Sequence, residues 1–490
     1  MHLQTDRAQL ELSGIGLKNN PDGPNKNLPA PDLALESATR FLTQCRENSQ
    51  LDVQPLAWKD LVDWHFVDGM LCHRSGGFFK MGALHTRASG ALEVHRQISI
   101  LQPEIGILGF IFARIDGEIR VLLQAKTEPG NVMGTQFAPS VQATVSNYTK
   151  KHGGADTAFL RYVSSAISDS KHRKALPTGV HLLSQTLQSE QGTRFFDKFN
   201  CNISVFCDEF LDELPPAWCW TNMPALRKLV VEDYCINTDA RSVLACTDWR
   251  MLSDDMPFAP RVDNQFDLHF RALLAESYTQ ILLANVQSAQ ARLIALQSSQ
   301  TQQCAFAPLA EAPRWRQRQH CGLTDSQGEF DLVLVSVKTK DREVTSWQQP
   351  LIRTLETGHV VLLCHAFKDG LKFLLRARAE PGFSRAMEYG PTFNSEIDLD
   401  LTERERWFPW IYQRTGLVYS HASVLQSDEG GRFMESAARY EIVELVDSPP
   451  KIGDSSFIWL SLGEIKNLLL QTGIFNNEFR SALALLIRWL

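Results

Sequence analysis

The chain contains two tandem copies of one pattern, and this repeat constrains the fold more than any other feature. The segment VLLQAKTEPG at 121–130 returns as FLLRARAEPG at 373–382, 252 residues later. Two further matches follow in the same order, offset by 238 and 239 residues. QSEQGTRF at 188–195 returns as QSDEGGRF at 426–433, and NTDARSVL at 237–244 returns as NNEFRSAL at 476–483. Such a period is too long for a solenoid and indicates duplication of a whole domain.

Each copy is predicted to be α+β, with mostly antiparallel strands and helices packed on the sheet. Two strands joined by a hairpin are expected at 105–127, because Asp116-Gly117 is a turn pair that tolerates positive φ. The second copy repeats this hairpin at 360–379, with its turn at Asp369-Gly370.

The other two repeated segments are predicted to be helical. Residues 188–199 and 425–436 are each expected to form a helix that precedes a β-rich run. Residues 237–248 and 476–490 are expected to form closing helices, the first with Asn237 as its N-cap and Asp239 in its first turn.

The repeat divides the chain into four predicted parts. Residues 1–29 are polar and rich in Asn, Gly and Pro, which is typical of a flexible segment. The first copy is placed at 30–250, a turn-rich linker at 251–264 and the second copy at 265–490. Residues 265–300 lack Pro and Gly and predict one long helix. This helix either supports the second copy or forms a dimer contact.

Composition excludes several classes of protein. The chain has 49 Lys and Arg against 56 Asp and Glu, so nucleic acid is not expected as a partner. The ten cysteines include no C-x-x-C pair, and H-E-x-x-H is absent, so no metal site is expected. No Rossmann or P-loop motif occurs. The N-terminal segment lacks the apolar stretch of a signal peptide, and no apolar run reaches the ~20 residues of a membrane span, so a cytoplasmic location is predicted.

One segment, 124–154, is dense in groups that form hydrogen bonds and directly follows an apolar strand. Such a set suits a ligand with many hydroxyls and phosphates, for example a nucleotide sugar. Lys126, Lys150 and Lys151 are candidates to meet a pyrophosphate. The alternative is structural: Pro129-Gly130 is then only a turn.

Two smaller clusters are weaker candidates. His73 and the pair Phe78-Phe79 flank paired glycines, and one of the two rings is a candidate to stack on a base. Trp347 is a second candidate platform, with Gln348 as a contact to the sugar or base. The alternative is that these aromatic residues belong to the core and that His73 is structural.

Several long motifs in the chain resemble those of the NDP-hexose 2,3-dehydratase family. They are QPEIGILGF at 102–110, LLQAKTEPGN at 122–131, APSVQATVSNYTKKHGG at 138–154 and VVEDYCINTDARSVL at 230–244, together with the repeated Q-S-x-x-G-x-R-F segment. The similarity extends over 56–490. The resemblance implies two tandem Nudix-like modules and a homodimer. No Nudix box occurs, so Nudix hydrolysis is not implied.

The resemblance also implies a reaction. Members of the family remove water across carbons 2 and 3 of a nucleotide-linked 4-keto-6-deoxyhexose, usually carried on dTDP, on the way to deoxysugars. The ketone acidifies the carbon 3 proton, a base removes it, and the carbon 2 hydroxyl leaves with help from an acid. This chemistry needs no redox cofactor. A non-catalytic nucleotide-sugar-binding homologue and a keto-enol isomerase are the alternatives.

Residue by residue, the resemblance assigns roles in this chain. Glu128 or Tyr148 is expected to be the acid or base, and Lys126 is expected to polarise the ketone oxygen or bind phosphate. Because Glu-Pro-Gly recurs at Glu380, Glu128 has a structural alternative as a turn residue. The predicted substrate-binding residues are Asn131, Gln142, Thr144, Ser146, Asn147, His73, Phe79, Trp347, Gln348 and Arg376.

The chain also departs from the family pattern. Family members usually carry S-W-x-Q-P in both copies, but here only the second copy keeps it, at 346–350. The second copy in turn is expected to have lost the P-T-V-Q-A-T-x-S-N-Y element, because it has GPTFNSE at 390–396. The first copy is therefore expected to hold the working site and the second a degenerate or accessory nucleotide pocket. A site that shares residues of both copies is the alternative.

Overall fold

The computed structural model describes residues 33–88, 94–145, 156–210, 212–253, 256–262, 264–299, 302–312, 315–318, 322–325, 330–340, 344–383, 387–397, 418–447, 449 and 452–490. The predicted flexible segment lies outside the described residues, as do Ser146, Asn147 and Tyr148. In the described part, no helix has both the length and the apolar character needed to cross a membrane.

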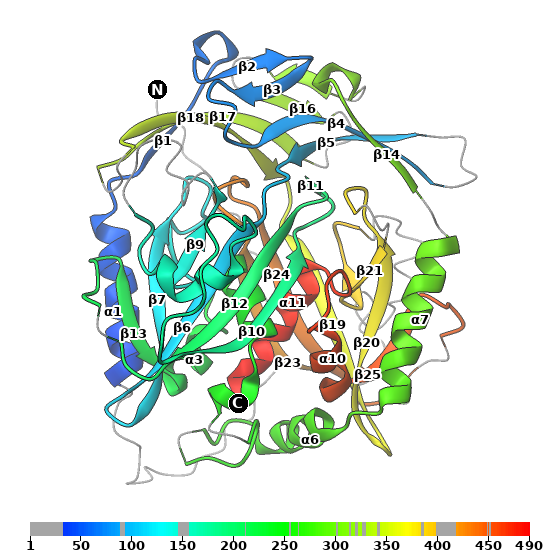
Figure 1. Cartoon of the computed structure of the whole chain (residues 1–490). Coiled ribbons are helices and arrows are strands. Elements are labelled where there is room, and N and C mark those ends of the chain that lie inside the picture. The colour runs from blue at the N-terminus through cyan, green and yellow to red at the C-terminus, as the bar shows by residue number, and fades with distance from the viewer. Residues whose placement is uncertain are drawn as a thin grey trace, which may run out of the picture.

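Two seven-stranded sheets carry the two copies (Figure 1). The first contains β6 (Gly106–Ile115), β7 (Glu118–Thr127), β8 (Thr135–Ala138), β9 (Val141–Ala143), β10 (Val180–Ser189), β12 (Phe199–Cys207) and β13 (Trp218–Asn222). The second contains β19 (Gly358–Phe367), β20 (Gly370–Ala379), β21 (Met387–Gly390), β22 (Phe393–Asn394), β23 (Val418–Ser427), β24 (Ala437–Leu445) and β25 (Phe457–Ser461).

The two sheets share one topology. The first has the order β10-β12-β6-β7-β13, with β8 on β7 and β9 on β6. The second has the order β23-β24-β19-β20-β25, with β21 on β20 and β22 on β19. Each strand therefore has a counterpart in the same place, which agrees with the predicted duplication and with mixed α+β copies.

The predicted hairpins are confirmed. β6 and β7 turn at Asp116 and Gly117, which have φ of 53° and 81°. β19 and β20 form the counterpart, and Gly370 has φ of 112°. Strand residues such as Phe112 and Val121 are buried and lie opposite each other, so the apolar pattern fixes the register.

The helices predicted at 188–199 and 425–436 are wrong. β10 runs to Ser189, a turn follows, and β12 begins at Phe199; β23, a turn and β24 repeat this arrangement. Each segment has one helix-like turn: Phe195 N donates to Gln191 O at 2.8 Å, and Phe433 N donates to Glu429 O at 2.9 Å. Backbone bonds to the other copy replace a longer helix, because Asp197 N donates to Gly382 O at 2.8 Å.

The closing helices are confirmed. α4 (Thr238–Cys246) begins where the Asn237 side chain accepts a hydrogen bond from Ala240 N at 2.9 Å. α11 (Asn477–Ala484) repeats the cap with Asn476 and continues into the short helix η4 (Leu485–Trp489). α4 and α11 pack against each other, so the two copies share one core. The shorter helices are α3 (Met223–Leu229), α5 (Trp249–Leu252), α10 (Leu462–Leu468) and η2 (Leu160–Ala166).

The single helix predicted at 265–300 is also wrong. The segment forms α6 (Leu268–Thr279) and α7 (Leu283–Ser299), with extended backbone at Gln280 between them. The start of α10 explains the break, because Ser461 Oγ donates to Gln280 O at 2.6 Å. α7 is the counterpart of α1 (Leu33–Asn48), and the two helices flank opposite sides of the molecule in Figure 1.

Two smaller sheets lie over one end of the large pair (Figure 1). The copies exchange strands there: β1 (Asp52–Pro55) pairs with β17 (Phe330–Lys338), while β14 (Gln302–Ala307) pairs with β4 (Lys80–Ala88). The two copies are therefore interlocked. The remaining strands are β2 (Trp64–Val67), β3 (Met70–His73), β5 (His95–Leu101), β11 (Phe195–Phe196), β15 (Trp315–Arg318), β16 (Gly322–Asp325) and β18 (Ser346–Thr354), and the short helices are η1 (Trp58–Asp60) and η3 (Leu309–Glu311).

Candidate functional site

Polar side chains from the predicted motif gather beside the first turn of α4. We call the set Lys126, Glu128, Gln136, Gln142 and Asp239 the first polar cluster. The Lys126 ammonium lies 2.8 Å from the Glu128 carboxylate. Gln142 on β9 donates from Nε2 to Asp239 Oδ2 at 2.5 Å. The β-ladder places Gln136 directly opposite Lys126.

The carboxyl group of Asp239 is buried, and its surroundings favour the protonated form. Burial raises the pKa of Asp239 well above its usual range, and the nearby charges of Glu429 and Glu190 raise this pKa further. Lys126 acts in the opposite direction. The cluster therefore joins an ammonium-paired carboxylate to a carboxyl group that can donate a proton.

Two other predicted residues lie next to the cluster. Asn131 shapes the turn after β7, because its Nδ2 donates to Gly134 O at 2.7 Å. Its Oδ1 is buried and has no hydrogen-bond partner in the described part of the chain. Thr144 follows β9 and is half-buried. The structure thus brings together Lys126, Glu128, Asn131 and Gln142.

The second copy forms one wall of this region. Gly130 N donates to Gly430 O, and Glu435 N donates to Gly130 O, each at 2.8 Å. A side chain at Gly130 would overlap the carbonyl oxygen of Phe433. Glycine is therefore required where the loop after β7 meets the loop between β23 and β24.

Two of the predicted aromatic residues lie against this loop of the second copy. Trp347 Nε1 donates to Gln349 Oε1 at 2.7 Å, and Gln349 Nε2 in turn donates to Gly431 O at 3.0 Å. The buried ring of Phe79 lies 4.3 Å from the Arg432 guanidinium. Both residues support the loop that meets Glu128.

The other three predicted residues lie farther along the small sheets or in the second copy. His73 on β3 accepts or donates a 2.8 Å hydrogen bond with Ser75 and packs edge-on against Trp64. Gln348 Oε1 accepts from Val62 N at 2.7 Å. Arg376 lies on β20, with its guanidinium 4.9 Å from the Phe457 ring. None of these named contacts is with the first polar cluster.

The second copy holds an equivalent set, which we call the second polar cluster: Arg378, Glu380, Glu388, Asn394 and Glu478. The registers of the strands show this equivalence directly. Asn394 pairs with Val360 in the second copy, as Gln142 pairs with Leu108 in the first. Arg378 likewise pairs with Glu388 as Lys126 pairs with Gln136.

The second copy lacks the sequence of the P-T-V-Q-A-T-x-S-N-Y element, but at Thr392 it keeps the hydroxyl group and the two hydrogen bonds that Ser140 makes in the first copy. Ser140 Oγ accepts from Ile111 N and donates to Leu122 O. Thr392 Oγ1 accepts from Leu363 N and donates to Leu374 O in the same way. The backbone element is kept while its side chains change, because these two bonds need only a hydroxyl group.

The second polar cluster is the more enclosed of the two. Asn394 is 0% exposed and Arg378 is 5% exposed, whereas Gln142 is half-buried and the Lys126 side chain is 20% exposed. Glu380 is also 0% exposed and accepts from Asn476 Nδ2 at 2.9 Å. Burial raises the pKa of Glu380 to about 7. A ligand from solvent therefore reaches polar atoms more easily in the first cluster.

Comparison with known proteins bears on what this arrangement does. The family model described as NDP-hexose 2,3-dehydratase matches residues 35–247 and 286–486. The chain belongs to the NDP-hexose 2,3-dehydratase family. The two matched segments coincide with the two copies of the fold.

Three relatives share the name dTDP-4-dehydro-6-deoxy-alpha-D-glucopyranose 2,3-dehydratase. The protein from Amycolatopsis orientalis is 30% identical, and the match covers 92% of this chain and 89% of that protein. The protein from Saccharopolyspora spinosa is 31% identical, with 89% and 88% covered. The protein from Streptomyces violaceoruber is 31% identical, with 87% and 90% covered.

In this member of the 2,3-dehydratase family, sequence reasoning missed Asp239, Glu190 and Glu429. A signal was present: both copies carry an acidic residue at the position of Asp239 and at that of Glu190. The resemblance drew attention to one continuous motif instead, and these acids lie on segments that only the fold brings to it.

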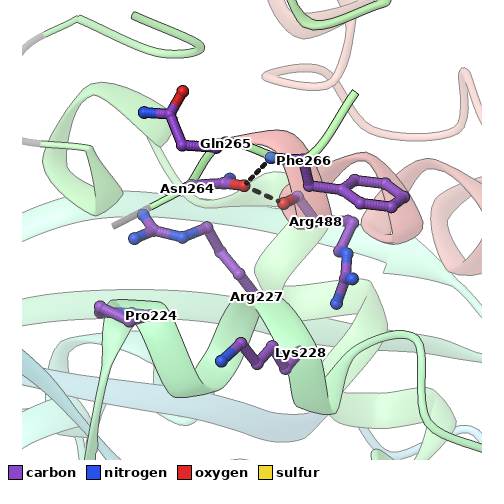
Figure 2. Close-up of a pocket in the computed structure, with 7 residues that line it drawn as sticks. All are labelled: Pro224, Arg227, Lys228, Asn264, Gln265, Phe266 and Arg488. Carbon is purple, nitrogen blue, oxygen red and sulfur yellow. Dashed lines mark hydrogen bonds between the residues drawn. The ribbon is translucent and has the colours of Figure 1, made fainter. Parts of the chain in front are cut away.

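A separate pocket of about 200 Å³ is lined by residues that belong to neither polar cluster (Figure 2). Three cationic side chains line it, but no carboxylate and none of the predicted site residues does. Within the described residues, no group of three or more His, Cys, Asp or Glu side chains is arranged to hold a metal ion. The pocket is lined by Pro224, Arg227, Lys228, Asn264, Gln265, Phe266 and Arg488.

Proposed function

We propose that this protein removes water across carbons 2 and 3 of dTDP-4-keto-6-deoxyglucose and that the first polar cluster carries the reaction. The observation that supports the site most directly is the pairing of Lys126 with Glu128 at 2.8 Å beside the buried carboxyl group of Asp239. The relatives named for this substrate support the choice of sugar.

In the proposed reaction, the residues of the site act as the base and as the group that stabilises negative charge. Glu128 or Tyr148 removes the proton on carbon 3, which the neighbouring ketone makes acidic. The electron pair moves into an enolate, and Lys126 stabilises its oxygen or binds the diphosphate. The enolate then expels the carbon 2 hydroxyl, which leaves as water after it receives a proton. The enol product tautomerises to the 3,4-diketo sugar.

Several finer features stay proposals. Each copy is a Nudix-like module, with the first at 30–250, the linker at 251–264 and the second at 265–490. The two-segment family match supports this division. The protein forms a homodimer in the cytoplasm, and the remaining predicted residues, including Ser146, Asn147 and Arg376, contact the substrate.

Product analysis tests the proposed function. The purified protein is incubated with dTDP-4-keto-6-deoxyglucose in deuterated water, and the sugar is followed by NMR and mass spectrometry. Loss of one water per sugar, or release of free nucleotide from the unstable diketo product, is expected. Deuterium at carbon 3 without loss of water would instead indicate a keto-enol isomerase, and binding without any change would indicate a non-catalytic homologue.

A further inference from the structure

The two repeated turns meet between the copies, and one pair of residues breaks the symmetry. We call residues 190–195 the first loop and residues 428–433 the second loop. Gln191 of the first loop donates from Nε2 to Asp428 Oδ1 of the second loop at 2.9 Å. By the repeat, the equivalent pair is Glu429 of the second loop and Glu190 of the first. The first pair therefore forms a hydrogen bond between an amide and a carboxyl group, whereas the equivalent pair consists of two carboxyl groups.

The two-carboxyl side is unfavourable for folding. Glu190 is buried and already accepts hydrogen bonds from Asn200 Nδ2 at 2.6 Å and Asn477 Nδ2 at 3.1 Å. Burial raises the pKa of Glu190 to about 7, and the charge of Glu429 adds to this rise. A glutamine at 429 would restore the hydrogen bond seen at Gln191. Glu429 therefore lowers stability at a position where glutamine would be more favourable. Such a residue indicates a role in function.

Glu429 also reaches the first polar cluster. A Cβ built on Gly431 would lie 3.2 Å from Glu429 Oε1 and 3.3 Å from Glu128 Oε1. The two carboxylate oxygens therefore lie within 6.5 Å of each other, on either side of a glycine. In the other half of the molecule, Gln191 and Thr193 occupy the places of Glu429 and Gly431.

The charges around Asp239 determine what Glu429 does there. Lys126 on β7 and Arg241 on α4 favour its ionised form, whereas Glu128, Glu190 and Glu429 favour its protonated form. Glu128 belongs to the motif at 124–154, and Glu190 belongs to the first loop. Glu429 is the one that the second copy supplies.

We propose that Glu429 is a positioning residue of the first polar cluster and that its negative charge keeps on Asp239 the proton that the departing carbon 2 hydroxyl receives. The working site is then shared by both copies, which is the alternative that the sequence left open. This inference rests on the proposed dehydration.

The test is the pH–rate profile of Glu429→Gln. Removal of the charge makes Asp239 lose its proton at lower pH, so the basic limb of kcat is expected to move down by about one pH unit, with a rate about tenfold lower above that limb. The melting temperature is expected to stay level or rise, because the new amide can donate to Glu190. Glu429→Asp keeps the charge and is expected to keep the limb near its wild-type position.

Gln191→Glu is the matched control, because it places a carboxylate at the equivalent position of the other half. It is expected to lower the melting temperature without moving the basic limb. A Glu429→Gln profile that coincides with the wild-type profile would overturn the proposal.

A second readout does not depend on turnover. The infrared band of the protonated Asp239 carboxyl group, assigned by its loss in Asp239→Asn, is expected to disappear at lower pH in Glu429→Gln than in the wild type. Absence of dehydration with this shift present would count against the proposed function alone. Absence of the shift would count against Glu429.

Discussion

At the scale of single residues, equivalent positions in the two copies carry different chemistry. Lys126, Gln142 and Glu429 in or beside the first polar cluster correspond to Arg378, Asn394 and Gln191. A lysine ammonium is compact and can approach a ketone oxygen, whereas the Arg378 guanidinium donates to Thr392 O at 2.9 Å. These differences favour the first polar cluster as the proposed reactive site.

Asp239→Asn is expected to lower kcat by about 10²–10⁴-fold, because an amide can hold the hydrogen bond but cannot give a proton to the leaving hydroxyl. KM is expected to change little. Steady-state kinetics check this, with Glu478→Gln as the matched carboxyl-to-amide change in the second polar cluster. Equal losses in the two variants would contradict the role of Asp239.

At this scale, the part of the proposed site that lies in one continuous motif could be predicted from the sequence. Lys126, Glu128 and Gln142 lie in one continuous motif, so their residue types and order were readable. Asp239 and Glu429 were not found, because pairing across 97 residues between Gln142 and Asp239 depends on the packing of α4 on the sheet. No local pattern encodes that contact.

At the scale of elements, the Glu-Pro-Gly turns lock the copies together. Gly382 N donates to Gly192 O at 2.7 Å, as Gly130 N does to Gly430 O. Because a side chain at either glycine would overlap a backbone carbonyl, Gly130→Ala and Gly382→Ala are each expected to destabilise the protein by about 1–3 kcal/mol. Chemical denaturation measures this loss.

The same pair of variants separates stability from activity. Gly130→Ala moves the loop beside Glu128 and is expected to lower kcat in addition, whereas Gly382→Ala is expected to lose stability without a matching loss in kcat. Similar kcat values for the two variants, measured well below their melting temperatures, would contradict the assignment of the site to the first copy.

Element prediction succeeded where local chemistry determines the structure. The Asp116-Gly117 turn and the Asn237 cap are short-range features, and both are present as expected. It failed at 188–199 and at 265–300, where bonds to the other copy or to α10 override local propensity.

At the scale of the whole molecule, the interface between the copies holds several buried acids. Burial raises the pKa values of Glu190, Glu380 and Asp428 to about 7, above the ordinary value near 4.5 or below. At a pH between the ordinary pKa and the raised pKa, the native state therefore binds more protons than the unfolded state. Stability is therefore greatest at the low end of this window and falls as pH rises through about 7.

We expect the melting temperature to fall between pH 5 and pH 7.5, with each such group contributing on the order of 1–3 kcal/mol. Lys466, whose pKa burial lowers to about 7, is protonated in both states at the low end of this window. Near its upper end the native state loses this proton while the unfolded state keeps it, so Lys466 opposes the trend there. Glu380→Gln removes one titrating group and is expected to flatten the decline. Differential scanning calorimetry across this range checks the sign, and a rise in stability would contradict it.

The duplication was readable from three short matches, but the exchange of β1 and β14 between the copies was not. Strand exchange leaves the sequence pattern of each copy unchanged, because a strand presents the same alternation to either sheet.

One of the two equivalent clusters, the first, is expected to carry the reaction. The most direct measurement is the rate of water loss from dTDP-4-keto-6-deoxyglucose by Glu128→Gln and Glu380→Gln, each shown to be folded by its melting temperature. The expected result is a loss of about 10²-fold or more in Glu128→Gln and a rate close to wild type in Glu380→Gln. A normal rate in Glu128→Gln together with a loss in Glu380→Gln would place the reaction in the second copy and contradict the account.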